Sequence, residues 1–381
     1  MLLASIEATN FRNLSGKISW GPQLNIIYGN NGQGKTNWLE AIHVLARTKS
    51  FRTQRLQETI RFGEDQAVIN GIVKCGSDIQ RELQVSLQGT TKSIAVNNKR
   101  EVLTRYLTHL AVFTFTALDL DVVRGMPEAR RRFLDRGVAS LKPSYLRDLA
   151  DYNKVIKHKN KILESALDEN RDRDTIRDLL APWNDQLVPL AWRIHSAREN
   201  YVKDLNRALE HQLFDRRHLT TRYISSLEGK GDINDYEGLF RSRLMLRQEA
   251  ELKSGHCLIG PHRDEWKILL DAREIRIFGS SGQQRSALLL LDLAAISLYN
   301  LALNENPIFI IDDVDAELDE RRIKRLLEYL ENRTQTFITT SKRSHVQGFI
   351  SRANTYEIED GRVRGTQSQL DATAMHKAPS Y

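Results

Sequence analysis

Cysteine is scarce in this sequence: Cys75 and Cys257 are the only two among 381 residues, and they lie far apart. Two separated thiols provide neither the spacing of a zinc site nor a disulfide framework, so we expect a protein of a reducing compartment. Long apolar runs are also missing, since no stretch approaches the roughly eighteen uninterrupted apolar residues of a membrane-spanning helix. Residues 1–11 lack the basic segment and apolar core of a secretory signal. We therefore expect a soluble, cytoplasmic protein with no membrane partner.

A strong excess of one charge is absent as well. The chain has 56 Lys and Arg residues against 49 Asp and Glu, which gives a net charge of +7. This excess is mild for the length, so it permits nucleic-acid contact without requiring it. The length itself suggests two or three domains with ample core.

The most informative segment is a glycine-rich loop that directly follows an apolar strand. Leu24–Tyr28 is the predicted strand, and residues 29–36 then match G-x-x-x-x-G-K-[ST], the phosphate-binding P-loop. Glycines let backbone N–H groups turn toward phosphates where a Cβ would block the approach. We expect Lys35 to contact the β- and γ-phosphates and Thr36 to hold Mg²⁺, at the positive end of the helix that starts there. The predicted ATP-binding residues of this loop are Gly29, Asn30, Asn31, Gly32, Gln33, Gly34, Lys35 and Thr36.

A second apolar strand, Ile308–Ile311, ends in two carboxylates. In a P-loop ATPase the first acid, Asp312, would hold Mg²⁺ directly or through water, and the second, Asp313, could orient or deprotonate the attacking water. The alternative is that the two acids only cap a turn. We predict Thr36 and Asp312 as metal ligands, and Asp313 and Lys35 as catalytic residues.

A second candidate anion site is the Ser/Gly loop at residues 279–285, which opens a long apolar helix. Its backbone N–H groups and the helix dipole favour a bound anion. One nucleotide does not need two such cradles from one chain, so we expect this loop to cover the γ-phosphate held by the P-loop of another copy. Its predicted ATP-binding residues are Ser280, Ser281, Gly282 and Gln283.

The remaining sequence divides by periodicity. Short alternating segments at 2–8, 16–20, 67–73, 82–87 and 93–96 predict strands, with Asn97-Asn98 as a hairpin turn. Residues 144–209 have helical spacing and predict an antiparallel helical hairpin or coiled-coil arm, with an ordinary helical subdomain as the alternative. Pro189 should kink the second helix or mark a boundary. Strands are then predicted at 266–270 and 275–278, and a helix at 285–302.

Together these motifs resemble the ABC-type ATPases, and within them the SMC–Rad50–RecF branch. Residues 29–36 look like the Walker A motif, 280–283 like the signature loop, 308–313 like Walker B and 316–319 like the D-loop. Four positions depart from the usual pattern: Ser281 for Gly, Asp313 for Glu, Ala316 for Ser and Thr340 for the switch His. The missing switch His leaves open how the γ-phosphate is sensed.

Further segments are similar to the signatures of the RecF family, at residues 118–125, 130–135, 152–157, 260–265 and 10–14. The resemblance covers about residues 1–345. It implies a DNA-repair ATPase that binds ATP and Mg²⁺, forms an ATP-dependent homodimer and engages double-stranded DNA and gap junctions. It also implies partners like RecO and RecR, and loading of RecA at single-strand gaps.

The expected fold class is α/β: an ABC-ATPase (SMC/Rad50-like) P-loop head assembled from N- and C-terminal segments, with an inserted helical or coiled-coil arm. The expected parts are an N-terminal ATPase lobe at 1–110, the arm at 111–255, a C-terminal ATPase lobe at 256–365 and a disordered tail at 366–381.

Basic residues gather in the expected arm and are candidates for contact with DNA phosphates. They are Arg130, Arg131, Arg132, Lys154 and Lys157. The alternative is a solvated helical face with salt bridges, the more common fate of such runs. His262, within residues 260–265, lacks the neighbours of a metal site, and we expect it to belong to a structural or nucleotide-sensing turn without a catalytic role.

The function that follows is an ATP-driven DNA-binding switch with slow hydrolysis. A nucleotide-gated scaffold that barely hydrolyses ATP stays open, because the side chain of Asp313 is shorter than Glu. A transporter ATPase subunit is a third possibility, against which the long helical insertion argues.

Overall fold

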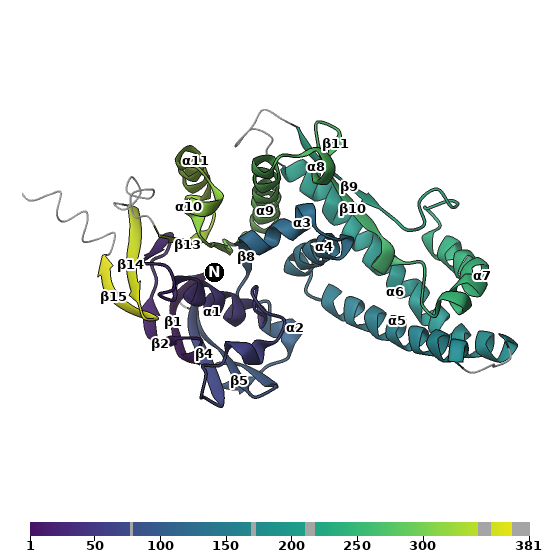
Figure 1. The fold of residues 1–381 in the computed structure, drawn as a ribbon, viewed down its shortest axis with the longest axis horizontal. Helices are drawn as coiled ribbons and strands as arrows, with labels where there is room; N and C mark the ends of the chain where they lie inside the picture. Colours follow the sequence, from purple (N-terminus) through teal and green to yellow (C-terminus); the bar gives the residue numbers. More distant parts are fainter. Residues whose placement is uncertain (77–78, 169–172, 210–217, 342–351, 368–381) are drawn as a thin grey trace, which may run out of the picture. The chain divides into compact units, whose positions relative to one another are not determined.

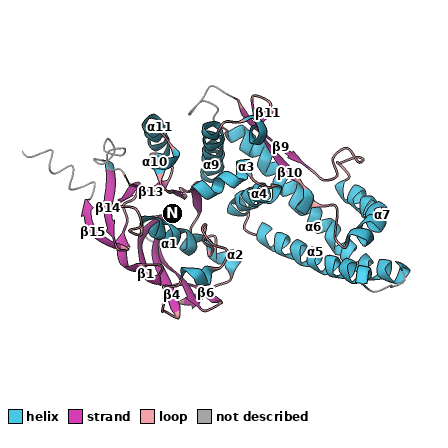
Figure 2. Cartoon of the chain, viewed as in Figure 1, coloured by secondary structure: helices cyan, strands magenta, loops and turns pink. Residues whose placement is uncertain are grey.

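The computed structural model describes residues 1–76, 79–168, 173–209, 218–341 and 352–367. The chain forms two compact units. Unit 1 comprises residues 1–120, 210–216 and 285–381, and unit 2 comprises residues 121–209 and 217–284. The ribbon is coloured along the sequence in Figure 1 and by secondary structure in Figure 2.

Unit 1 contains an antiparallel sheet with the strand order β2-β1-β4-β5-β6-β7. Its strands are β1 (Leu2–Phe11), β2 (Leu14–Ser19), β4 (Gln66–Cys75), β5 (Ile79–Gln88), β6 (Thr91–Val96) and β7 (Lys99–Arg100). Alternate residues of β4 are buried, as expected for strands with one covered face. Asn97 and Asn98 both have positive φ, which suits the tight turn between β6 and β7. The predicted strands and hairpin of this region are therefore confirmed.

The second sheet of unit 1 has the order β15-β14-β3-β13-β12-β8. Its strands are β3 (Leu24–Tyr28), β8 (Val112–Phe115), β12 (Ile308–Ile311), β13 (Gln335–Thr340), β14 (Ala353–Glu359) and β15 (Arg362–Gln367). All pairs are parallel except β14 with β15. Every residue of β12 and β13 is buried, which is typical of parallel strands covered on both faces.

Helix α1 (Lys35–Arg47) joins the two sheets into one core. It contacts β1, β4 and β5 of the first sheet and β8 and β13 of the second. Trp38, Leu39, Ile42 and Leu45 are all buried on it. Helix α11 (Glu320–Leu330) buries a stripe at Ile323, Leu326, Leu327 and Leu330. Because α1 starts where β3 ends, the core fixes the position of the P-loop between them.

Unit 2 is mainly helical. It contains α3 (Asp121–Arg124), α4 (Pro127–Leu141), α5 (Tyr145–Asp168), α6 (Arg173–Ala208), α7 (Tyr236–Ser254) and α8 (Ile275–Phe278). Helices α5 and α6 contact each other along their lengths and α7 packs on both, so the predicted helical hairpin is confirmed. Helix α6 continues through Pro182 and Pro189, so neither proline ends it. A small antiparallel sheet has the order β11-β10-β9, formed by Arg273–Glu274, Glu265–Leu270 and Leu219–Ile224.

Three expectations differ from the structure. Residues 275–278 form helix α8 and not a strand, because the hairpin residues Asp271 and Ala272 end β10 and only Ile275 of the next turn is buried. Thr366 and Gln367 belong to β15, while the rest of the expected tail lies outside the described residues. The compact units also divide the chain after residues 120 and 284 and not at the expected boundaries. Residues 256–284 were expected in the C-terminal lobe, but they lie in unit 2 because β10 pairs with β9.

Helix α9 (Ser281–Leu303) begins in the signature loop and continues into unit 1. It is apolar and long enough to cross a membrane, but 67% of its most apolar window is buried in the protein. Such burial is typical of a core helix.

Candidate nucleotide-binding site

The P-loop connects the end of β3 to the start of α1. Gly29, Gly32 and Gly34 all have φ between +81° and +146°, the region that residues with a Cβ rarely adopt. A Cβ at Gly29 would also lie 2.4 Å from the backbone oxygen of Ile358. The sequence pattern is thus matched by a loop that only glycine can form at these positions.

Lys35 is buried at the start of α1 and folds back onto its own loop. Its Nζ donates to the backbone oxygens of Gly29 at 2.7 Å and Asn30 at 2.9 Å. Burial lowers the pKa of Lys35 from its ordinary value, although the carboxylates of Asp313, Asp315 and Asp312 oppose this shift. The ammonium therefore lies inside the loop, in the position from which it can reach a bound phosphate.

A chain of hydrogen bonds connects the P-loop to the carboxylates after β12. Thr36 Oγ1 donates to Asp312 Oδ1 at 2.9 Å, and Thr339 Oγ1 donates to the same oxygen at 2.7 Å. The hydroxyl of Thr339 also accepts from the backbone N–H of Asp313 at 2.8 Å. Asp313 is exposed and has φ 48°, which is uncommon for a residue with a side chain. Thr339 thus holds both carboxylate residues in place, a role that the sequence analysis missed.

The Thr36 hydroxyl and the Asp312 carboxylate are hard oxygen ligands within hydrogen-bond distance of each other. Mg²⁺ prefers this donor type and commonly takes one or two protein oxygens, with phosphate and water completing its octahedron. The residues present therefore fit the predicted metal. They lie at the carboxyl ends of β3 and β12, where ligands bind in open parallel sheets.

Two turns support the P-loop from outside. The backbone N–H groups of Asp360 and Gly361 donate to Gln33 Oε1 and to Gln33 O, each at 2.8 Å. Asn13 accepts from Asn37 Nδ2 at 2.8 Å and lies against Gly34. Residues 10–14 are predicted from sequence only as a family motif, with no predicted contact to the P-loop. These contacts join distant segments, so sequence spacing gave no signal for them.

The predicted signature residues begin helix α9 in unit 2. Ser280 and Ser281 are exposed, and reciprocal hydrogen bonds between Ser280 and Gln283 stabilise the loop. Ser280 N donates to Gln283 Oε1 at 2.8 Å, and Gln283 N donates to Ser280 Oγ at 3.3 Å. This reciprocal arrangement is a capping box, which fixes the start of helix α9.

The structure corrects part of the predicted DNA-binding set. Arg130 is only 4% exposed and forms two hydrogen bonds with Glu265, at 2.7 and 3.1 Å. Arg131 donates to the backbone oxygen of Asp264, and Arg132 pairs with Glu128 one helical turn away. Arg130 therefore stabilises unit 2 itself and is removed from the candidates for DNA contact. Arg132 is exposed and Arg131 is half-buried, so both stay predicted DNA contacts.

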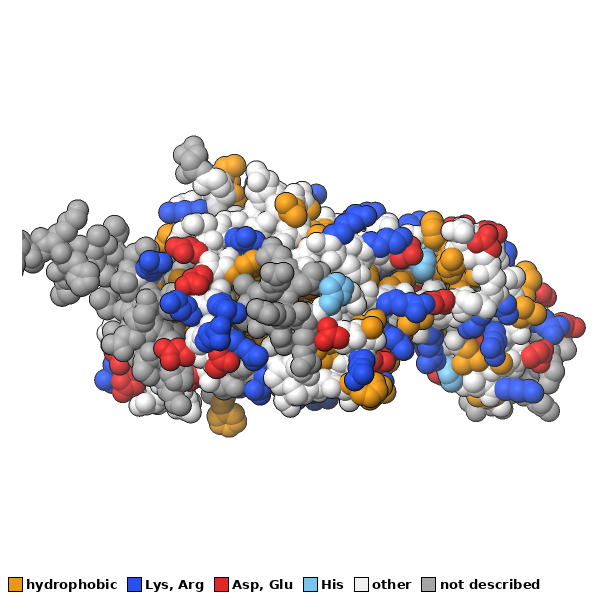
Figure 3. All heavy atoms as spheres, turned by 90° about the horizontal axis from the view of Figure 1, so that it is seen from above, with side chains coloured by type: hydrophobic (Ala, Val, Ile, Leu, Met, Phe, Trp, Pro, Cys, Tyr) orange, Lys and Arg blue, Asp and Glu red, His pale blue; other side chains and the backbone are white. Residues whose placement is uncertain are grey.

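Lys154 and Lys157, the other two candidates, are exposed on α5 three residues apart. At this spacing their side chains share one helix face. On the face drawn in Figure 3, basic and acidic side chains are interspersed rather than collected in one patch.

The turn at residues 260–265 forms a buried polar centre of unit 2. Tyr152 OH lies 2.6 Å from His262 Nδ1, and His262 Nε2 lies 3.2 Å from the backbone oxygen of Cys257. These contacts suit a neutral ring that carries its proton on Nε2, and burial lowers the pKa of His262 to about 4. Asp264 is fully buried and accepts from the Tyr223 hydroxyl and from Ser226 N. His262 therefore has a structural role here.

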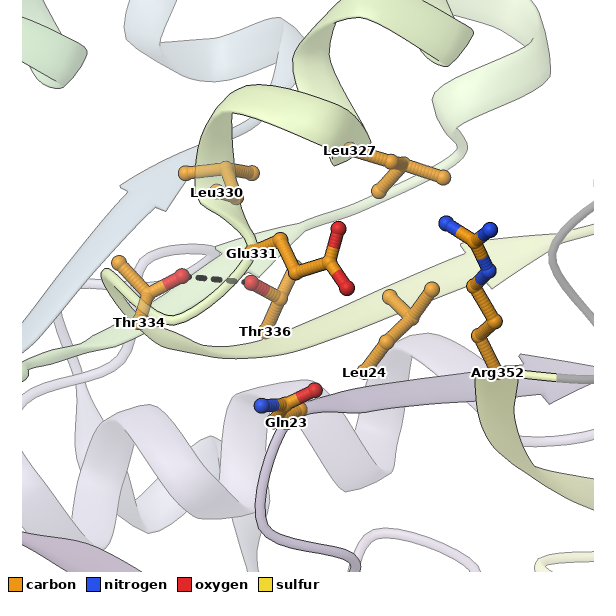
Figure 4. A pocket seen from close by; sticks show the side chains of 8 residues that line it. All are labelled: Gln23, Leu24, Leu327, Leu330, Glu331, Thr334, Thr336 and Arg352. Atoms are coloured by element: carbon orange, nitrogen blue, oxygen red, sulfur yellow. Dashed lines mark hydrogen bonds between the residues drawn. The ribbon is translucent and has the colours of Figure 1, made fainter. Parts of the chain in front are cut away.

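A shallow hollow lies at the other end of the parallel sheet (Figure 4). It is lined by Gln23, Leu24, Leu327, Leu330, Glu331, Thr334, Thr336 and Arg352. Leu24 begins β3, whereas the P-loop follows the last residue of that strand. The hollow is therefore separate from the nucleotide site.

Comparisons with known proteins agree with this geometry. The family model described as the RecF/RecN/SMC N-terminal domain matches residues 2–363. A DNA replication and repair protein RecF from Geobacillus thermodenitrificans (strain NG80-2) is 32% identical over 372 residues, which cover 95% of this chain and 99% of the relative. The RecF of Streptococcus pneumoniae (strain CGSP14) is 34% identical over 371 residues, with the same coverage of 95% and 99%.

Two solved structures extend the comparison. One, described as the recombination mediator protein RecF-ATP in the RecFOR pathway, has a TM-score of 0.87 and 29% identity and covers 96% of this chain and 98% of its own. The Smc head domain from Pyrococcus furiosus, bound to the C-terminal domain of ScpA, has a TM-score of 0.56 and 14% identity and covers 99% and 98%. The second match shows the fold alone.

Proposed function

This chain belongs to the RecF family and has the SMC-like ABC-ATPase head fold, and on this premise we propose that it is a recombination mediator ATPase that binds double-stranded DNA. The observation that carries the proposal is the hydrogen-bond chain Thr36–Asp312–Thr339–Asp313 beside the P-loop. If Asp312 only capped a turn, its carboxylate would have no need of the Thr36 hydroxyl from the P-loop. An Mg-ATP site needs these two groups side by side.

In the proposed site Lys35 neutralises charge on the β- and γ-phosphates, while Thr36 and Asp312 hold Mg²⁺. Bound Mg²⁺ would supply charge neutralisation at the same phosphates. Asp313 orients the attacking water and accepts its proton. The hydroxyl of Thr339 accepts from the backbone N–H of Asp313 and so supports the unusual backbone conformation of that residue.

The same proposal assigns Ser280–Gln283 to the nucleotide of a second copy, which makes ATP the link of a two-fold homodimer. Sedimentation of Asp313→Asn tests this assignment, since Asn cannot act as a base but keeps the shape of the side chain. We expect a dimer with Mg-ATP and a monomer with ADP. A monomer in both solutions would overturn the shared site.

For DNA we propose phosphate contacts by the exposed lysines of α5, Lys154 and Lys157, at duplexes and gap junctions. In this role the protein would act with RecO-like and RecR-like partners before RecA loading. The test is binding of duplex and gapped DNA with ATP, ADP and no nucleotide, at two salt concentrations. Binding that is equal in all three nucleotide states would contradict an ATP-driven switch.

A scaffold that binds ATP with negligible turnover is the second candidate. It is favoured by the short acidic side chain of Asp313, whose reach is one methylene less than that of Glu. Measured turnover, with and without DNA, separates the two functions.

A further inference from the structure

Two large apolar side chains lie exposed directly before the signature loop. Ile277 and Phe278, on the single turn of α8, are 61% and 66% exposed, although Ile275 on the same turn is buried. Exposed apolar residues scattered singly need no explanation, but an adjacent pair beside a functional loop does.

The pair is held rigidly to the signature loop. Gly279 N donates to Ile275 O at 2.9 Å, and Gln284 Nε2 donates to the same oxygen at 3.2 Å. Gln284 is itself buried, and its Oε1 accepts from Arg124 Nε on α3 at 2.9 Å. The turn of α8 and the start of α9 therefore form one fixed element, in which the apolar pair cannot move away from Ser280.

We infer that Ile277 and Phe278 form an apolar anchor for a second copy of this chain at the ATP-dependent dimer interface. The inference rests on the proposed function, in which Ser280 contacts the nucleotide of that copy. Two residues span at most about 7 Å, so Phe278 lies close to any copy that contacts Ser280.

The surroundings of the pair have the composition of an interface. Arg276 and Lys267 both contact Glu274, at 3.1 and 3.5 Å, and they place a charged, solvent-exposed rim next to the apolar side chains. Interfaces commonly combine an apolar centre with a polar rim. In a two-fold dimer each copy contributes the same surface, so the pair is used twice.

The first test is sedimentation velocity of the full chain with Mg-ATP. Ile277→Ser combined with Phe278→Ser should raise the dimer dissociation constant at least tenfold, while fluorescent-ATP binding by the monomer stays unchanged. The matched control is Met245→Ser with Leu246→Ser on α7, an adjacent apolar pair that is 68% and 70% exposed. The control should dimerise like the wild type.

A wild-type dimer together with an equally stable dimer of the α8 variant would overturn this inference and leave the proposed function intact. A wild-type protein that stays monomeric in Mg-ATP would overturn both. A second measurement uses Phe278→Cys, with alkylation followed at that peptide by mass spectrometry. Mg-ATP should slow the reaction and ADP should not, and an unchanged rate in a dimer-forming sample would refute the anchor.

Discussion

Removing the buried hydroxyl of Thr339 should lower both the stability of unit 1 and its proposed affinity for Mg-ATP. A matched variant elsewhere on the same strand should lower the stability alone. Thr339→Val keeps the shape of the side chain but leaves Asp313 N–H without its acceptor and removes one of the two hydroxyl donors of Asp312. Thr339 is 0% exposed, so water cannot readily replace the lost partner. The substitution therefore acts on both carboxylate residues at once.

The magnitude follows from the two lost interactions. A hydrogen bond to a charged group contributes about 1.5–3 kcal/mol, and an unsatisfied buried N–H costs about 1–3 kcal/mol. Asp312 is only partly buried and Asp313 is exposed, so we expect a total loss of roughly 1–3 kcal/mol. This corresponds to a fall in melting temperature of about 2–12 °C. The part of ATP affinity that depends on Mg²⁺ should fall at least tenfold, because Asp312 loses its fixed orientation.

The assay compares thermal melting with fluorescent-ATP titration in Mg²⁺ and in EDTA. Thr336→Val is the matched control: Thr336 lies on the same strand, is 2% exposed, and shares a hydrogen bond of 2.6 Å with Thr334 away from the site. It should lower the melting temperature similarly and leave Mg-ATP binding unchanged. If Thr339→Val has the same Mg-ATP affinity as Thr336→Val, Thr339 is a packing residue and the reasoning fails.

Three further predictions follow from the two units. Lys35→Ala should weaken ATP binding by about 1.5–3 kcal/mol, roughly ten- to a hundredfold, and an unchanged dissociation constant would mean that the nucleotide binds elsewhere. Burial lowers the pKa of His262 from 6.5 to about 4, so between these values the unfolded chain binds more protons and stability falls on acidification, by up to about 3 kcal/mol. His262→Gln should lose this dependence in denaturant titrations from pH 7 to 4.5. The double variant Lys154→Glu with Lys157→Glu should weaken DNA binding. It should also reduce the slope of log binding constant against log salt concentration by about one per lost contact. Arg130→Ala should cost about 2–4 kcal/mol of stability and leave that slope unchanged.

The nucleotide motifs could be predicted because their chemistry is local. Eight consecutive residues define the P-loop, and the strand before it supplies the context that confirms it. The helical hairpin was equally accessible, because α5 and α6 repeat one spacing over many turns. The strand predicted at residues 275–278 was wrong, because a short apolar segment of four residues fits a strand and a helical turn equally well.

Residues joined across long sequence separations were beyond such reasoning. Thr339 lies in the strand in which only the position of a switch histidine was considered. Its two partners, Asp313 and Asp312, lie 26 and 27 residues away. The error at Arg130 has the same origin, since its partner Glu265 is 135 residues away. A cluster of charges on a helix does not reveal from sequence which members face inward.

Lys35 and Thr36 both have hydrogen-bond partners within the protein. The ammonium of Lys35 has two loop carbonyls as partners, and the Thr36 hydroxyl has Asp312. In the proposed function, phosphate would replace the loop carbonyls at Lys35 and Mg²⁺ would replace the hydrogen bond of Thr36. The net gain in binding free energy would then be the difference between the new and the lost interactions. Lys35 also stabilises the loop whose glycines have costly backbone conformations. In the proposed function, these contacts of Lys35 preorganise the P-loop, which would lower the ordering cost of ATP binding and limit the affinity that Lys35 itself adds.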